Sequence, residues 1–124
     1  MNGHRDNGEN SALAELAAEY WKLLRNYDHV VAAAPENLKA GLAAQANYAT
    51  RRLISILGKS GLHIETFEEQ VYLPNLPITA LNAEDFSEGE PALVEQTLEP
   101  AIISGTTPIR FGRVYLRPAP RKEE

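Results

Sequence analysis

Apolar residues in the first part of the chain recur at alternating intervals of three and four positions. The positions are Leu13, Leu16, Tyr20, Leu23, Tyr27, Val30 and Ala34. This spacing continues for about three heptads and predicts a helix with an apolar seam along one side. Ser11 is a residue type favoured at the N-cap, so we expect this helix to begin near it. Pro35 interrupts the pattern and suits the first position of a second helix.

The second predicted helix also carries its apolar residues on one side and ends near Gly61, a plausible C-cap glycine. These residues are Leu38, Leu42, Ala46, Ala49, Leu53, Ile56 and Leu57. The joint at Pro35 is very short. The two helices therefore either form an antiparallel hairpin or continue as one kinked helix.

The pattern changes after Ser60, because seven of the eight prolines lie beyond this point together with many β-branched residues. Short strands are expected at 62–67, 78–81, 93–103 with a break at Pro100, and 109–116, with a hairpin loop at 105–108. The segment 84–91 is acidic and is predicted to be an exposed loop. In the last strand, Val114 and Leu116 point to one face, and Arg113, Tyr115 and Arg117 point to the other.

These patterns predict an α+β protein in which N-terminal helices precede a small all-β domain. We divide the chain into a disordered leader (1–10), a helical dimerisation region (11–60), a β domain (61–119) and a tail (120–124). The apolar seam can be an intramolecular core or a seam between two chains. Two helix pairs suit a four-helix bundle made from two copies, so we expect a homodimer. The expected interface residues are Leu13, Leu16, Tyr20, Leu23, Tyr27, Val30, Leu42, Leu53 and Ile56.

Composition narrows the possible partners. The chain has 124 residues, a net charge of −5 and no cysteine. The acidic balance argues against nucleic acid and anionic membranes as partners, because both require basic surfaces. Disulfides and zinc–thiolate sites are excluded, and no apolar run approaches the ~20 residues that span a bilayer. We therefore expect a cytoplasmic protein.

The sequence contains no recognisable catalytic pattern. His4, His29 and His63 lie in no metal-binding spacing, and the glycine-rich phosphate motifs are missing. The acidic pairs Glu68-Glu69 and Glu84-Asp85 are interpreted as solvated charge. We expect no enzyme activity, no cofactor and no metal, and the enzymatic alternative requires a pocket that gathers Glu68, Glu69 and His63.

The face formed by Arg113, Tyr115 and Arg117, with Arg110 nearby, is unusual in an acidic protein. Arginine and tyrosine are favoured at protein interfaces, which suggests a partner-binding surface. The alternative is a solvated strand face whose charges pair with Glu95 and Glu99 across the sheet.

Taken in order, four segments resemble GrpE, the nucleotide exchange factor of DnaK-type chaperones. The resemblance runs from about Leu23 to Ala119. It rests on 23–30, 52–62 and 72–76, and most specifically on 112–119 (Gly-Arg-Val-Tyr-Leu-Arg-Pro-Ala), which is very close to the family's final Gly-Arg-x-Leu-Arg-Pro-Ala strand.

The resemblance implies a non-enzymatic co-chaperone that is a helical dimer with a β "wing" on each chain. The wing would bind the nucleotide-binding domain of a DnaK-type chaperone and promote ADP release. Arg113 and Arg117 would lie on the contact strand, and Asp28 on the helix before the bundle. The family's long N-terminal stalk is expected to be mostly missing, and Leu73 and Pro77-Ile78 replace the family's Asp and His-Glu. These departures leave open an alternative, a GrpE-like scaffold that serves as an adaptor for a different partner.

Overall fold

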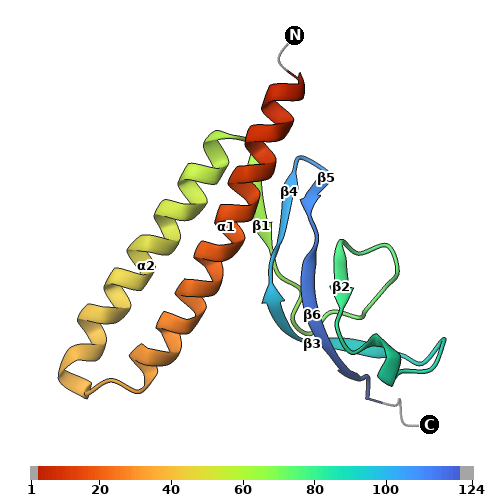
Figure 1. Cartoon of the computed structure of the whole chain (residues 1–124). Coiled ribbons are helices and arrows are strands. Elements are labelled where there is room, and N and C mark those ends of the chain that lie inside the picture. Colours follow the sequence, from red (N-terminus) through yellow and green to blue (C-terminus); the bar gives the residue numbers. More distant parts are fainter. Residues whose placement is uncertain (1–2, 121–124) are drawn as a thin grey trace.

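The chain folds into two helices followed by a small all-β domain, as the sequence predicts (Figure 1). The computed structural model describes the backbone of residues 3–120 and the side chains from Gly8 onward. Two helices, α1 (Gly3–Ala32) and α2 (Glu36–Lys59), come first. The strands are β1 (Leu62–Glu65), β2 (Ile78–Ala80), β3 (Ala92–Glu99), β4 (Ala101–Ser104), β5 (Thr107–Arg110) and β6 (Gly112–Pro118), with a 3-10 turn η1 (Ala83–Asp85).

The first helix begins earlier than predicted. It starts at Gly3 rather than near Ser11, so most of the leader that we expected to be disordered is helical. The polar residues before Ser11 include no proline, and each glycine costs a helix only about 1 kcal/mol relative to alanine. Nothing in the leader therefore stops the helix. Residues 1–2 and most of the predicted tail, 121–124, lie outside the described residues.

Pro35 and Gly61 delimit the second helix. Pro35 has φ −58° and lies at the N-cap, one position earlier than predicted, and Gly61 has φ +73° beyond the C-terminal end. The Gly61 N–H donates to the Gly58 carbonyl over 3.0 Å, which closes the last turn. The chain reverses at Pro35, so α1 and α2 form the antiparallel hairpin and not the kinked helix (Figure 1).

Six strands form two three-stranded sheets. Sheet A has the order β1-β4-β5 and is antiparallel. Sheet B has the order β2-β6-β3, with β6 in the centre, parallel to β2 and antiparallel to β3. The hairpin between β4 and β5 turns at Gly105 and Thr106, within the predicted loop.

The predicted strand 109–116 is wrong in one respect, because it divides at Phe111 into β5 and β6, which belong to different sheets. Gly112 begins β6 where the chain crosses the end of β3. A Cβ atom at Gly112 would lie 2.8 Å from the Glu99 carbonyl oxygen and 3.0 Å from the Ala101 nitrogen. Only glycine permits this close approach of two backbone segments.

Two apolar clusters hold these layers together. One lies between the sheets and includes Phe67, Ile78, Val94, Ile103, Val114 and Leu116. The other joins the hairpin to sheet A and includes Ala14, Ala17, Leu53, Leu57, Leu62 and Ile102. The small Ala14 and Ala17 let sheet A approach α1 closely. Because this side of the hairpin is covered by the sheet, its other side is left to face outward.

Candidate protein-binding site

The outward face of β6 carries the residues that the sequence predicted. Val114 and Leu116 are buried between the sheets, whereas Arg113, Tyr115 and Arg117 alternate with them on the opposite side. The Arg113 side chain is 55% exposed and Tyr115 is 41% exposed. These three residues are called the β6 face below. Because β6 is the central strand of sheet B, they are presented by a rigid platform.

Arg117 is engaged by an acidic neighbour within the domain. Its guanidinium binds the two carboxylate oxygens of Glu69, one of them from Nη1 over 3.2 Å. These hydrogen bonds hold the pKa of Glu69 below its ordinary value and that of Arg117 above it. Both groups are exposed, so the pair orients Arg117 more than it stabilises the fold.

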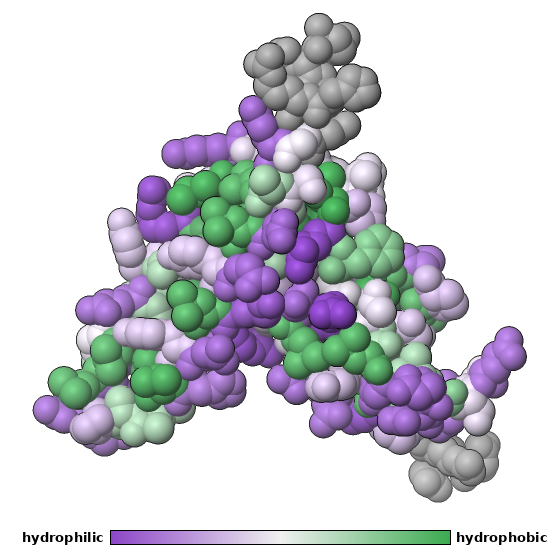
Figure 2. Space-filling model, in the orientation of Figure 1, coloured by the Kyte–Doolittle hydropathy of each residue, from purple (hydrophilic) through white to green (hydrophobic). Residues whose placement is uncertain are grey.

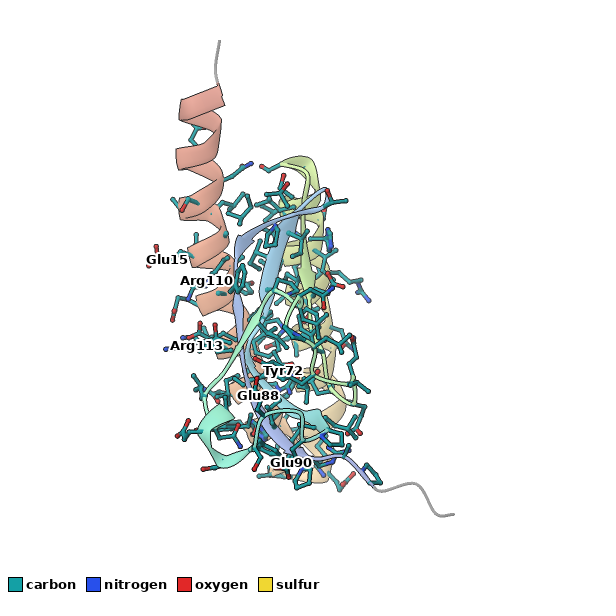
Figure 3. All side chains as sticks on the ribbon, turned by 90° about the vertical axis from the view of Figure 1, so that its right-hand side faces the viewer. Glu15, Tyr72, Glu88, Glu90, Arg110 and Arg113 are labelled. Carbon is teal, nitrogen blue, oxygen red and sulfur yellow. The ribbon has the colours of Figure 1, made fainter. Side chains whose placement is uncertain are left out.

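Arg110 lies near the β6 face, as predicted, but on a separate strand, because the predicted strand 109–116 is divided at Phe111. It lies on β5, in the other sheet, and its Nη2 donates to Glu99 Oε1 over 2.9 Å. Lys22 of α1 donates to the other oxygen of Glu99 over 3.0 Å. Arg113 Nη1 lies 3.9 Å from the same oxygen. Figure 3 shows Arg110 and Arg113 on the side of the β domain that adjoins α1.

Glu99 therefore gathers three cations while its own side chain is only 11% exposed. Burial alone would raise the pKa of this carboxyl group. The hydrogen bonds from Lys22 and Arg110 outweigh burial and hold the pKa below its ordinary value. The solvated-face alternative is partly right, since Glu99 lies directly across from Arg113. Glu99, however, makes its shorter contacts with Lys22 and Arg110, so Arg113 stays largely accessible.

A second ion pair ties α1 to the β domain. Arg25 stacks on the ring of Trp21, 4.8 Å from its centroid, and donates to Glu68 Oε2 over 3.2 Å. The Thr97 N–H donates to the same oxygen over 2.9 Å. Burial would raise the pKa of Glu68, but the hydrogen bonds from Thr97 and Arg25 leave it lowered. Together with Lys22–Glu99, this contact fixes the orientation of the β domain on the helix.

The outer side of the hairpin is an exposed apolar surface. Leu16, Leu23 and Val30 are 64%, 67% and 63% exposed, and Tyr20 is 39% exposed. Together with the half-buried Tyr27, they are called the hairpin stripe below. The space-filling view shows apolar atoms reaching the surface of the helical limb between polar groups (Figure 2).

Leu13 of α1, which is half-buried, adjoins this surface, and α2 continues it, since Ile56 is 41% exposed and Leu42 is half-buried. An apolar groove of about 170 Å³ between the helices is lined by residues that include Leu13, Leu16, Tyr20 and Ile56. Leu53 is the exception among the expected interface residues, because sheet A buries it in the core beside Leu57 and Ile102. Although it borders the groove, only 7% of it is exposed.

Asp28, the remaining predicted contact residue, lies apart from the β6 face. It is exposed on α1 and lines a cavity of about 390 Å³ between the hairpin and β1. The other predicted contact residues do not line this cavity; they are Arg110, Arg113, Tyr115 and Arg117. His63 does line it, but Glu68 and Glu69 do not, so the three residues of the enzymatic alternative share no cavity.

Sequence reasoning missed three exposed apolar residues of the β domain. Phe111 is 53% exposed at the crossing between the two sheets. Val71 and Leu73 are 53% and 47% exposed and line a groove of about 420 Å³ together with Glu88 and Glu90, which Figure 3 labels. Pro74 follows Leu73 and Pro77 lies three residues further on, which disfavours a regular strand here, but only the fold shows that the apolar side chains of this segment remain uncovered.

Comparison with protein-family models, curated proteins and solved structures finds no match to this chain. Within the described residues, no helix has the length and apolar character needed to cross a membrane. The same residues contain no group of three or more His, Asp or Glu side chains arranged to hold a metal ion.

Proposed function

We propose that the chain is a non-enzymatic, cytoplasmic co-chaperone of the GrpE type, which binds the nucleotide-binding domain of a DnaK-type chaperone and promotes ADP release. The observation that carries this proposal is the β6 face. The strand with the strongest resemblance to the family directs Arg113, Tyr115 and Arg117 outward from the centre of sheet B. Arginine and tyrosine are the residue types that most often dominate binding energy at protein interfaces.

In this proposal, the hairpin stripe is covered by the hairpin of a second copy. Side chains such as Leu16, Leu23 and Val30 leave most of their apolar surface in water within one chain. Burying a leucine or valine side chain contributes about 1.5–3 kcal/mol. Each residue occurs twice in a symmetric pair, so three positions contribute six such burials and favour a four-helix bundle.

The rigid joint between α1 and the β domain supports an exchange mechanism. A factor that opens a nucleotide cleft must bind the open state of its partner more tightly than the closed state, with a coupling free energy of about 1–3 kcal/mol. A loosely attached β domain would move as the cleft closes and would not oppose the closure. Lys22–Glu99 and Arg25–Glu68 hold the β domain to the helix, so a contact at the β6 face is supported by the whole dimer.

The proposal is tested by the release of labelled ADP from a DnaK-type chaperone in stopped-flow mixing. The wild-type chain should accelerate release, and Arg113→Glu should reduce that acceleration at least tenfold. The matched control is Arg51→Glu, the same charge change at an exposed position on α2. It should behave as the wild type. Unchanged release at saturating wild-type protein would refute the proposal.

The adaptor alternative has one observation in its favour. Where the family motif has Asp, this chain has Leu73, which is 47% exposed beside Val71 and the groove they line. An apolar surface in place of a charged one fits a changed partner. Affinity capture on the immobilised chain separates the two proposals, because recovery of a different protein without the chaperone would favour the adaptor.

A further inference from the structure

The cavity between the hairpin and β1 combines apolar walls with an unpaired strand edge. Its walls include Trp21 and Leu24 of α1 and Ile54 of α2. Ile54 is 57% exposed, although it lies on the side of the hairpin that carries the β domain. Sheet A thus leaves part of α2 uncovered beside β1. This cavity is called the β1 groove below.

The β1 groove runs along the edge of the strand and not over one of its faces. His63 and Ile64 are neighbours in β1, so their side chains leave opposite faces of sheet A. Both nevertheless line the groove. One cavity can contact side chains of both faces only where the strand borders it edgewise.

This edge has unused hydrogen-bonding capacity. β1 is the terminal strand of sheet A and pairs only with β4. Across the described chain, the backbone of residues 63–66 makes no hydrogen bond outside that pairing. An exposed strand edge is a template for a further strand, and pockets beside it select the side chains of the added strand.

The charges at the groove favour a basic occupant. Arg25 is the one arginine that lines the groove, and it is already bound to Glu68 and stacked on Trp21. Asp28 is the one carboxylate that lines the groove, and it has no ion-pair partner among the described residues. The Asp28 carboxylate therefore faces an occupant with no paired cation to balance it.

We propose that the β1 groove binds an extended segment of a partner polypeptide, which adds a fourth strand to sheet A beside β1. An apolar side chain of that segment covers Ile54, and a lysine or arginine next to it pairs with Asp28. This surface is separate from the β6 face and from the hairpin stripe. It goes beyond the proposed exchange function and does not depend on it.

The test uses a fluorescein-labelled heptapeptide that alternates threonine with valine and has a lysine at each end, in fluorescence anisotropy with the full chain. Saturable binding is expected. Methylation of alternate backbone nitrogens should weaken binding at least tenfold, since it removes the donors that pair with the edge. Replacing both lysines with glutamates should weaken it at least fivefold. Equal binding of the methylated peptide, or no binding at millimolar protein, would overturn the proposal.

Variants of the chain locate the peptide. Ile54→Asp should weaken binding at least tenfold, whereas Tyr48→Asp, at a similarly exposed position of α2 outside the groove, should not. Asp28→Asn should reduce the preference for the lysine peptide, whereas Asp85→Asn should leave it unchanged. If Ile54→Asp instead abolishes self-association in sedimentation, a second copy occupies the edge and the proposal of a partner segment is wrong.

Discussion

Replacing Glu99 with glutamine should destabilise the fold more than the same change at any other carboxylate that forms an ion pair. The Glu99 carboxylate is 11% exposed and accepts hydrogen bonds from Lys22 and Arg110 over 3.0 and 2.9 Å. A hydrogen bond to a charged group contributes about 1.5–3 kcal/mol when well shielded. Water can partly replace these two hydrogen bonds, because the Lys22 and Arg110 side chains are 34% and 30% exposed.

Because this exposure weakens both hydrogen bonds, Glu99→Gln should lower the free energy of unfolding by about 2–3 kcal/mol at pH 7. For a chain of this length, the melting temperature should fall by roughly 10 °C. Urea unfolding at one fixed protein concentration measures the change. The matched control is Glu95→Gln, an exposed position on the same strand, which should change stability by less than about 0.5 kcal/mol.

The pH dependence gives an independent check on Glu99. Its folded pKa is lower than the unfolded value, so its contribution is fully present above the unfolded pKa of about 4.3 and is lost as the pH falls through the folded pKa. The difference between wild type and Glu99→Gln should therefore be constant above about pH 6 and shrink on acidification. Equal stabilities of Glu99→Gln and Glu95→Gln at pH 7 would refute the reasoning.

Other substitutions test separate parts of the structure. Gly112→Ala places a Cβ against the Glu99 carbonyl oxygen and should cost about 1–3 kcal/mol in urea unfolding, and a neutral result would contradict the close approach. Thr97→Val removes the hydroxyl that accepts the buried Phe67 N–H and should cost about 1–3 kcal/mol, unlike Thr79→Val, whose side chain is exposed. Leu23→Asp should raise the dimer dissociation constant at least a hundredfold, since two copies lose about 1.5 kcal/mol each, and circular dichroism should show an unchanged fold. Retained dimerisation would exclude the hairpin stripe as the interface.

The sequence predicted those features that depend on local periodicity. The heptad spacing located the hairpin stripe, and the alternation in 113–117 located the β6 face, because each pattern is set by the geometry of a single element. Pro35 and Gly61 marked the helix ends for the same reason. The start of α1 was missed because the polar leader contains no residue that excludes helix.

The remaining errors concern contacts between distant segments. Arg110 and Arg113 are three residues apart and were assigned to one strand, but the chain changes sheets at Phe111. No local pattern reveals that Glu99 lies under both of them and beside Lys22. Likewise, Leu53 follows the same apolar spacing as its neighbours, and only the packing of sheet A places it inside the chain.

The hairpin stripe provides the most direct test of the account, because the proposed dimer requires that a second copy cover it. Sedimentation equilibrium of the full chain across a range of concentrations measures this. We predict a reversible approach to twice the chain mass of 13.7 kDa, and a shift of that transition to much higher concentration for Leu23→Asp. A wild-type mass that remains at 13.7 kDa up to high micromolar concentration would contradict the account.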